Sequence, residues 1–87
     1  MIVEHFHPDK IKAIYERFDE KGRILPNGVR YIDSWIDEGL GKCFQLMEAE
    51  SRDLINEWIN QWNDLVDFEV YLVIDSKLAR EKAFSLH

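Results

Sequence analysis

The sequence predicts a small α+β fold, in which a four-stranded antiparallel sheet carries two helices on one face. Three observations predict this class. Strand-like and helix-like segments alternate along the chain, turn residues separate them, and 46% of the residues are apolar, which is enough for a core. The 87 residues form a single domain over residues 1–87, near the lower size limit for a chain that folds alone.

The first half of the chain predicts a strand, a helix and a second strand. MIVEHF opens as a strand and stops before Pro8, which cannot donate to a strand ladder but fits a first helical turn. A helix is expected over about 8–21, and Gly22 suits the position after its end. The apolar stripe of this helix consists of Ile11, Ile14, Tyr15 and Phe18. A turn at 25–28 then leads into a strand over about 29–37.

The second half predicts a strand, a helix, a fourth strand and a short last helix. Two glycines at 38–41 suit a hairpin into a strand over about 42–49. Ser51 suits the cap of the next helix. Its apolar stripe consists of Leu54, Trp58, Ile59, Trp62 and Leu65. A strand over about 67–74 and a helix over about 76–84 complete the order β-α-β-β-α-β-α, which is that of a ferredoxin-like fold with a C-terminal helix.

Apolar residues occur on both faces of the predicted strands. In the second strand, simple alternation places Ile32 and Ile36 on one face, and Tyr31, Asp33 and Trp35 on the other. Two helices cover only one face of a sheet, so a second chain is the economical cover for the other face. The sequence therefore predicts a homodimer that packs sheet face to sheet face about a two-fold axis.

Four pieces of the sequence together resemble an uncharacterised family of small prokaryotic domains of unknown function. They are KGR at 21–23, DSW at 33–35, CFQLME at 43–48 and EW at 57–58, and the resemblance covers nearly all of the chain. In layout the chain is also similar to the dimeric α/β-barrel superfamily, in which two ferredoxin-like chains pack sheet to sheet. That superfamily includes cofactor-free monooxygenases, haem-handling enzymes, isomerases and pure binding proteins. The resemblance therefore implies an architecture and no single reaction.

Composition and motifs argue against several function classes. With 11 basic and 17 acidic residues, the chain offers no broad cationic surface for nucleic acid. Its apolar runs are too short to span a membrane, and MIVEHFHPDK lacks the pattern of a signal peptide. The single Cys43 lies in an apolar run, which indicates a buried thiol in a reducing compartment, so we expect a cytoplasmic protein. No nucleotide-binding or C-x-x-C motif occurs, and we expect no cofactor.

His5 and Asp33 are the candidate catalytic residues. They lie on the first and second predicted strands, and Gln45 and Glu48 lie on the third, which pairs with both. A histidine beside a carboxylate is the minimum for general-base catalysis. The hairpin register decides the outcome: a centred loop places Asp33 near Leu46, whereas a one-residue shift places it on the face of Gln45. The alternative, which we favour, is a polar network at a pocket wall or dimer interface.

The candidate ligand-binding residues are Gln45, Glu48, Trp35, Trp58 and Arg23. Trp58 lies four residues before Trp62, so both indoles share a helix face and would line an aromatic pocket or pack in the core. Arg23 follows the end of a helix and would bind an anionic ligand, lie in solvent or cap backbone carbonyls.

Two further polar pairs have simpler expectations. Arg30 and Glu48 are expected to form an ion pair across the predicted hairpin. His5 and His7 form an H-x-H pair, but no third ligand follows at a motif spacing, so no metal site is predicted.

These observations favour a small homodimeric binding module with an aromatic-lined pocket for a small organic, hydrophobic ligand between the sheet and the helices. The second hypothesis is a cofactor-free enzyme of the monooxygenase or isomerase type, with His5 or Asp33 as its base. The third is a structural or regulatory interaction protein without a pocket. A cavity with two or more convergent polar side chains favours the first two hypotheses, and a filled core favours the third.

Overall fold

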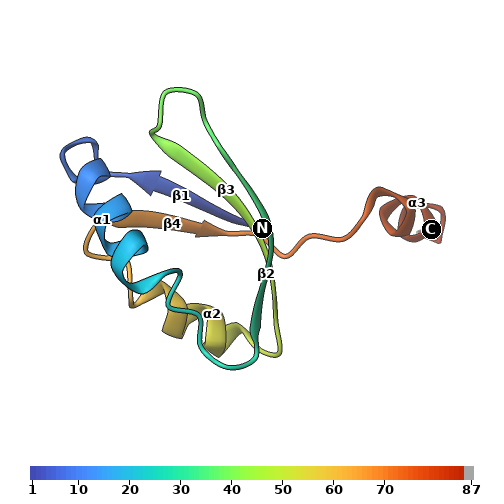
Figure 1. Cartoon of the computed structure of the whole chain (residues 1–87). Helices are drawn as coiled ribbons and strands as arrows, with labels where there is room; N and C mark the ends of the chain where they lie inside the picture. Colours follow the sequence, from blue (N-terminus) through green and yellow to red (C-terminus); the bar gives the residue numbers. More distant parts are fainter. Residues whose placement is uncertain (86–87) are drawn as a thin grey trace.

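An open four-stranded antiparallel sheet forms one layer of this computed structural model, and two helices cover one of its faces (Figure 1). The structure describes residues 1–85. Within them the strands are β1 (Ile2–Phe6), β2 (Val29–Ile36), β3 (Lys42–Ala49) and β4 (Val66–Val70). The helices are α1 (Ile11–Lys21), which follows a short 3-10 turn at Pro8–Lys10, α2 (Arg52–Ile59) and α3 (Ser76–Phe84). The predicted α+β class with a four-stranded antiparallel sheet is therefore confirmed.

The strands lie in the order β2-β3-β1-β4, so β1 is flanked on both sides. Ile2, Glu4 and Phe6 are buried, whereas Val3 and His5 are half-buried, which gives β1 a period of two. Glu4 lies opposite both Cys43 on β3 and Phe68 on β4. This register places one row of side chains under the helices.

The core lies between the sheet and the two helices that cover it. Its buried apolar residues are Ile2, Phe6, Ile14, Cys43, Ile55, Trp58, Trp62, Leu65 and Val66. Trp58 packs edge-on against Phe68, with ring centroids 5.3 Å apart. Two large indoles supply much of the apolar area that an 87-residue chain needs to bury.

The loop between α1 and β2 is held against α2 and the turn that follows it. Gly22 adopts a φ of 66° and donates its N–H to the carbonyl of Phe18, which ends α1. The indole N–H groups of Trp58 and Trp62 both donate to the carbonyl of Arg23, at 2.9 and 3.0 Å. The loop therefore follows α2 closely before β2 begins.

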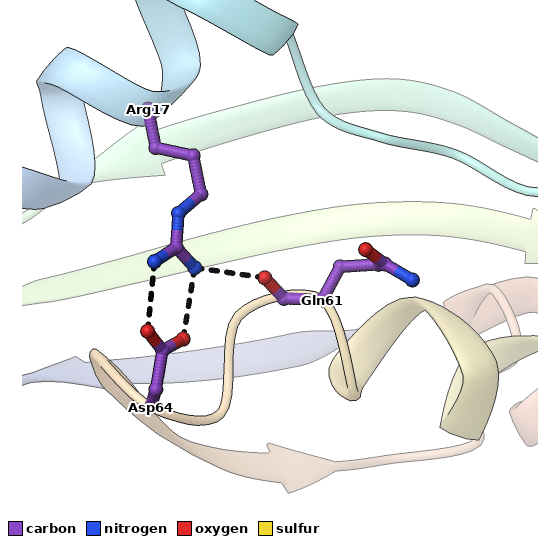
Figure 2. A network of polar contacts seen from close by, with 3 residues as sticks. All are labelled: Arg17, Gln61 and Asp64. Atoms are coloured by element: carbon purple, nitrogen blue, oxygen red, sulfur yellow. Dashed lines mark hydrogen bonds and ion pairs between the residues drawn. The ribbon is translucent and has the colours of Figure 1, made fainter.

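A second tie joins α1 to the turn after α2 (Figure 2). Arg17 donates two hydrogen bonds to the carboxylate of Asp64, at 2.8 and 2.7 Å, and a third to the carbonyl of Gln61, at 2.9 Å. Its guanidinium also lies 5.5 Å from the ring centroid of Trp62. The hydrogen bonding from Arg17 lowers the pKa of Asp64, so both side chains are charged throughout the neutral range.

A bulge in β2 changes the faces expected for the segment YIDSWID. Tyr31 lies opposite Met47 and Asp33 lies opposite Leu46, so Ile32 is an extra residue in the ladder. Tyr31 therefore faces the helices with Ser34, to which its hydroxyl is hydrogen-bonded at 2.7 Å. The expectation that Tyr31 shares a face with Asp33 is wrong, because simple alternation fails at a bulge.

Two predicted boundaries differ from the structure. The helix α2 ends at Ile59, and Trp62 reaches the core from the turn that follows. The strand β4 ends at Val70 instead of residue 74. The N–H of Tyr71 still donates to the carbonyl of Met1, but no strand lies beside residues 72–74 to continue the ladder.

The C-terminal segment lies away from the body of the domain, as Figure 1 shows for α3. Every residue over 71–85 is exposed, and Leu72 is fully so. The side chain of Asp75 accepts a hydrogen bond from the N–H of Leu78 and caps α3. The radius of gyration is 15.0 Å, compared with about 12 Å for a compact chain of this length. We refer to residues 71–85 as the C-terminal arm.

We expect Arg17→Met to lower the free energy of unfolding by about 1 kcal/mol, because it removes a paired guanidinium and a bond to a backbone carbonyl. Lys12→Met is the matched control, since Lys12 is exposed and lies 3.7 Å from Glu16. Urea denaturation of both variants measures the difference. An equal effect of the two substitutions would contradict the role of Arg17.

Candidate functional site

A cavity of about 210 Å³ lies between the covered face of the sheet and the helical layer. Its apolar wall includes Phe6, Ile14, Trp58, Trp62 and Val66. Its polar lining consists of Glu4, Arg23, Ser34, Cys43 and Gln45, with Tyr15 and Phe18 beside them. The cavity therefore combines an apolar body with several polar groups, as sites for small organic molecules do.

Glu4 is a buried acid in the middle of β1, with 9% of its surface exposed. Burial raises the pKa of Glu4 to about 7, although the hydrogen bond from Cys43 and the charge of Arg23 oppose the shift. Burial and the nearby Glu4 raise the pKa of Cys43 to about 12, so Cys43 is a neutral thiol and not a nucleophile at neutral pH. Glu4, in contrast, exchanges its proton near neutral pH.

Arg23 brings a cation to the same cavity from the loop after α1. Its guanidinium carbon lies 3.5 Å from the ring centroid of Tyr31 and 5.1 Å from that of Phe18. Among the described residues, no carboxylate lies within 4.0 Å of Arg23, and its buried Nε has no hydrogen-bond acceptor. Arg23 therefore brings a guanidinium without a carboxylate partner to the cavity.

Gln45 adds a third polar group, from β3. Only 5% of its surface is exposed, and its amide nitrogen lies 3.1 Å from the sulfur of Met47. A thioether is a weak acceptor, so the amide retains most of its hydrogen-bonding capacity. Gln45 lies opposite Ile2 and Ser34 on the neighbouring strands, which places it on the cavity side of the sheet.

The predicted site residues divide between the two faces of the sheet. Arg23, Gln45 and Trp58 line the cavity. Trp35, 53% exposed, and Glu48 lie on the open face, by which we mean the side of the sheet away from α1 and α2. Glu48 forms the expected ion pair with Arg30, at 2.6 Å.

The expectation that His5 or Asp33 lies in the pocket is corrected by the structure. His5 faces the open side and pairs with Glu69 at 2.6 Å, because Ile2 and Phe6 set the phase of β1. Asp33 is exposed on that side and accepts a hydrogen bond from the N–H of Ser34, because the bulge turns it outward. With β3 between their strands, His5 and Asp33 form no acid–base pair.

Glu4 is the site residue that the sequence reasoning missed. It stands two residues after Ile2 and two before Phe6, so all three share one face of a strand. An acid between two apolar residues at this spacing is a signal for a buried carboxyl. That signal depends on which face of β1 is covered, and the sequence MIVEHF allows either.

Other classes of site have little support in the described part of the chain. Residues 1–85 contain no group of three or more His, Cys, Asp and Glu side chains placed to hold a metal ion. His7 pairs with Asp67 at 3.1 Å, so the two histidines of the H-x-H pair each contact an acid of β4. No helix in this range is long and apolar enough to cross a membrane.

Fold and cavity define a small α+β domain in which an open sheet and two helices place a buried acid and an arginine at one cavity. The family model described as Domain of unknown function (DUF3303) matches residues 1–86, and the chain belongs to this family. The expected resemblance to an uncharacterised family is thus confirmed. Neither a curated protein nor a solved structure matches the chain.

We expect Glu4→Gln to stabilise the protein at alkaline pH. Because the pKa of Glu4 rises from 4.5 to about 7 on folding, the folded chain binds this proton more tightly than the unfolded chain. Ionisation of Glu4 therefore lowers the free energy of unfolding progressively from pH 4.5 to pH 7 and fully above it, by on the order of 3 kcal/mol.

The variant should exceed the wild type in stability at about pH 8 and match it at about pH 4. Denaturation at a series of pH values measures this difference. Glu48→Gln, on the exposed ion pair, is the matched control and should follow the wild-type pH dependence. Parallel curves for Glu4→Gln and the wild type would refute the buried ionisation.

Proposed function

We propose that the protein is a small binding module that holds a small organic ligand in the cavity between the sheet and the helices. The observation that supports this most is the convergence of Glu4 and Arg23 on a cavity with largely aromatic and aliphatic walls. Its volume of about 210 Å³ exceeds the ~150 Å³ of an apolar cavity that admits benzene. A cavity of this size favours a binding role over that of an interaction protein with a filled core.

A cofactor-free enzyme is the second candidate function, with Glu4 as its base in place of His5 or Asp33. A buried carboxyl with a pKa of about 7 suits proton transfer at neutral pH. A proton abstracted by Glu4 from an apolar substrate would leave an anion beside Arg23. Turnover that Glu4→Gln abolishes without loss of ligand binding would favour this function over simple binding.

We also propose that the domain is ferredoxin-like and forms a homodimer through the open face of its sheet. The strand order β2-β3-β1-β4 and the two helices on one face support the fold assignment. Trp35 and Phe44 are cross-strand neighbours on the open face and are 53% and 37% exposed. An aromatic pair of this kind is a suitable centre for an isologous contact.

The C-terminal arm supports a second copy as the partner of this face. Its apolar residues are left exposed by their own chain: Tyr71, Leu72, Val73, Ile74, Leu78 and Phe84 are all exposed. The arm carries the cations Lys77, Arg80 and Lys82 and the acids Asp75 and Glu81, so its net charge is positive. The open face carries the acids Asp33, Glu48, Asp67 and Glu69. Most of these acids already pair within the chain, with His5, His7 and Arg30, so the exposed apolar residues of the arm are the main support for its lying along the rim of a partner's open face.

We expect a small molecule to co-purify with the native protein, or a small aromatic compound to bind it with quenching of indole fluorescence. Trp58 and Trp62 line the cavity, so a Trp35→Phe background leaves them as the reporters. Mass spectrometry under native conditions and a fluorescence screen of small aromatic compounds test the proposal. Failure of both measurements would overturn the binding function.

We expect Trp35→Asp to convert the dimer to a monomer, because it places a charge at the centre of the proposed contact. Lys12→Asp, on the exposed side of α1, is the control and should remain dimeric. Sedimentation of both variants at micromolar concentration gives their masses. A monomeric wild type would overturn the homodimer.

A further inference from the structure

We propose that the ligand of the cavity is a small organic carboxylate with an apolar body, that Arg23 binds its carboxylate, and that Glu4 takes up a proton when it binds. This inference rests on the proposed binding function, and it names the ligand class.

The anion is inferred from Arg23, a half-buried arginine at the cavity that has no carboxylate partner. Arg52 and Arg80 have none either, but both are exposed. Arg17 and Arg30 each hold a carboxylate, at 2.7 and 2.6 Å. Arg23 has no such partner within the described residues, and its buried Nε lacks an acceptor. A ligand carboxylate at the cavity would supply the missing countercharge and accept hydrogen bonds from the guanidinium.

Arg23 is also held in place before any ligand arrives. The two indole bonds fix its carbonyl, and the face of its guanidinium packs on Tyr31 at 3.5 Å. Packing of one face leaves the in-plane N–H groups free to donate. A cation fixed in this way loses little side-chain entropy when it binds an anion.

A monoanion fits the cavity better than a phosphate ester. Arg23 is the one cationic side chain among the described residues that line the cavity. A dianion beside a single arginine and the acid Glu4 would remain under-compensated in a partly buried site. The apolar wall of Phe6, Ile14 and Trp58 offers space for about one ring, by comparison with the ~150 Å³ benzene-binding cavity.

Proton uptake follows from the position of Glu4 on the same cavity. The titratable or charged groups that face it are the Cys43 thiol from β3, Arg23 from the loop, and Tyr15 from α1. The helix α2 and the strand β4 bring only the apolar Trp58 and Val66 to this lining. Arg23 is thus the one charge that favours ionised Glu4, and a bound carboxylate neutralises it.

A bound carboxylate therefore favours the protonated form of Glu4. The proton comes from solvent, and the resulting O–H donates to the ligand instead of repelling it. Because the pKa of Glu4 is about 7, protonation costs little at neutral pH. Binding should then weaken by up to about tenfold for each pH unit above 7.

Benzoate and its neutral isostere benzamide are the probes that test this inference. Isothermal titration calorimetry in two buffers of different ionisation enthalpy gives both the affinity and the number of protons taken up. We expect benzoate to bind with uptake of about one proton above pH 7, and with falling affinity from about pH 7 to pH 9. Benzamide should bind more weakly at about pH 6 and without proton uptake.

Matched variants separate the two roles. Arg23→Gln should weaken benzoate binding by roughly tenfold or more, whereas Arg30→Gln on the open face should not change it. Glu4→Gln keeps a neutral hydrogen-bonding group, so it should bind benzoate with no proton uptake and with affinity independent of pH. This second variant keeps the test decisive even if Arg23→Gln fails to fold.

The outcomes distinguish this inference from the proposed function. Benzamide binding that equals or exceeds benzoate binding would overturn the anion site and leave the binding function standing. Benzoate binding without proton uptake in the wild type would overturn the role of Glu4. Absence of binding by both probes would overturn the inference, and the co-purification and fluorescence measurements would then decide the binding function separately.

Discussion

The two indole N–H groups of Trp58 and Trp62 share one acceptor, the carbonyl of Arg23. Buried indoles need an acceptor and a buried carbonyl needs donors, so one arrangement satisfies three polar groups that would otherwise destabilise the core. It fixes the loop after α1 against α2, and so determines where β2 begins. The same bonds hold the backbone of Arg23 at the cavity. The same two hydrogen bonds therefore stabilise the core and position Arg23.

The sheet separates two kinds of surface. On the covered side, Glu4 and Gln45 are buried polar residues among aromatic ones, which is costly unless a bound group satisfies them. On the open side, Trp35 and Phe44 are exposed apolar residues beside charged pairs. Polar residues are normally exposed and large apolar residues are normally buried, so the covered side has buried polar groups and the open side has exposed apolar groups against this rule. Departures of this kind concentrate at functional surfaces, because a sequence selected for folding alone would avoid them.

The element types and their order could be predicted from the sequence because apolar periodicity and turn residues determine them locally. Strand faces were less predictable. No glycine or other turn residue in the sequence indicates the bulge at Ile32. Because of this bulge, Tyr31 and Asp33 lie on opposite faces of the sheet. The strand β4 ends where β1, its partner in the ladder, begins. This end therefore depends on pairing between segments that are distant in the sequence. Within the candidate site, the tryptophan of α2 could be placed by its helical spacing.

The convergence of Arg23 on Glu4 could not be predicted, because it depends on the path of a loop. Ile24 adopts a φ of 58°, a conformation that a β-branched residue rarely takes and that no residue pattern signals. The inward direction of Glu4 depends on which face of β1 the helices cover. Candidate residues on loops and central strands therefore need tertiary information, whereas those on helices do not.

Cys43 has a consequence for any association between copies of this chain. It is the single cysteine, it is buried, and the raised pKa keeps its proton in place at neutral pH. Such a thiol is a poor partner for disulfide exchange. Two copies can therefore be held together only by noncovalent contacts, and their assembly obeys mass action: it depends on the concentration of the protein and reverses on dilution.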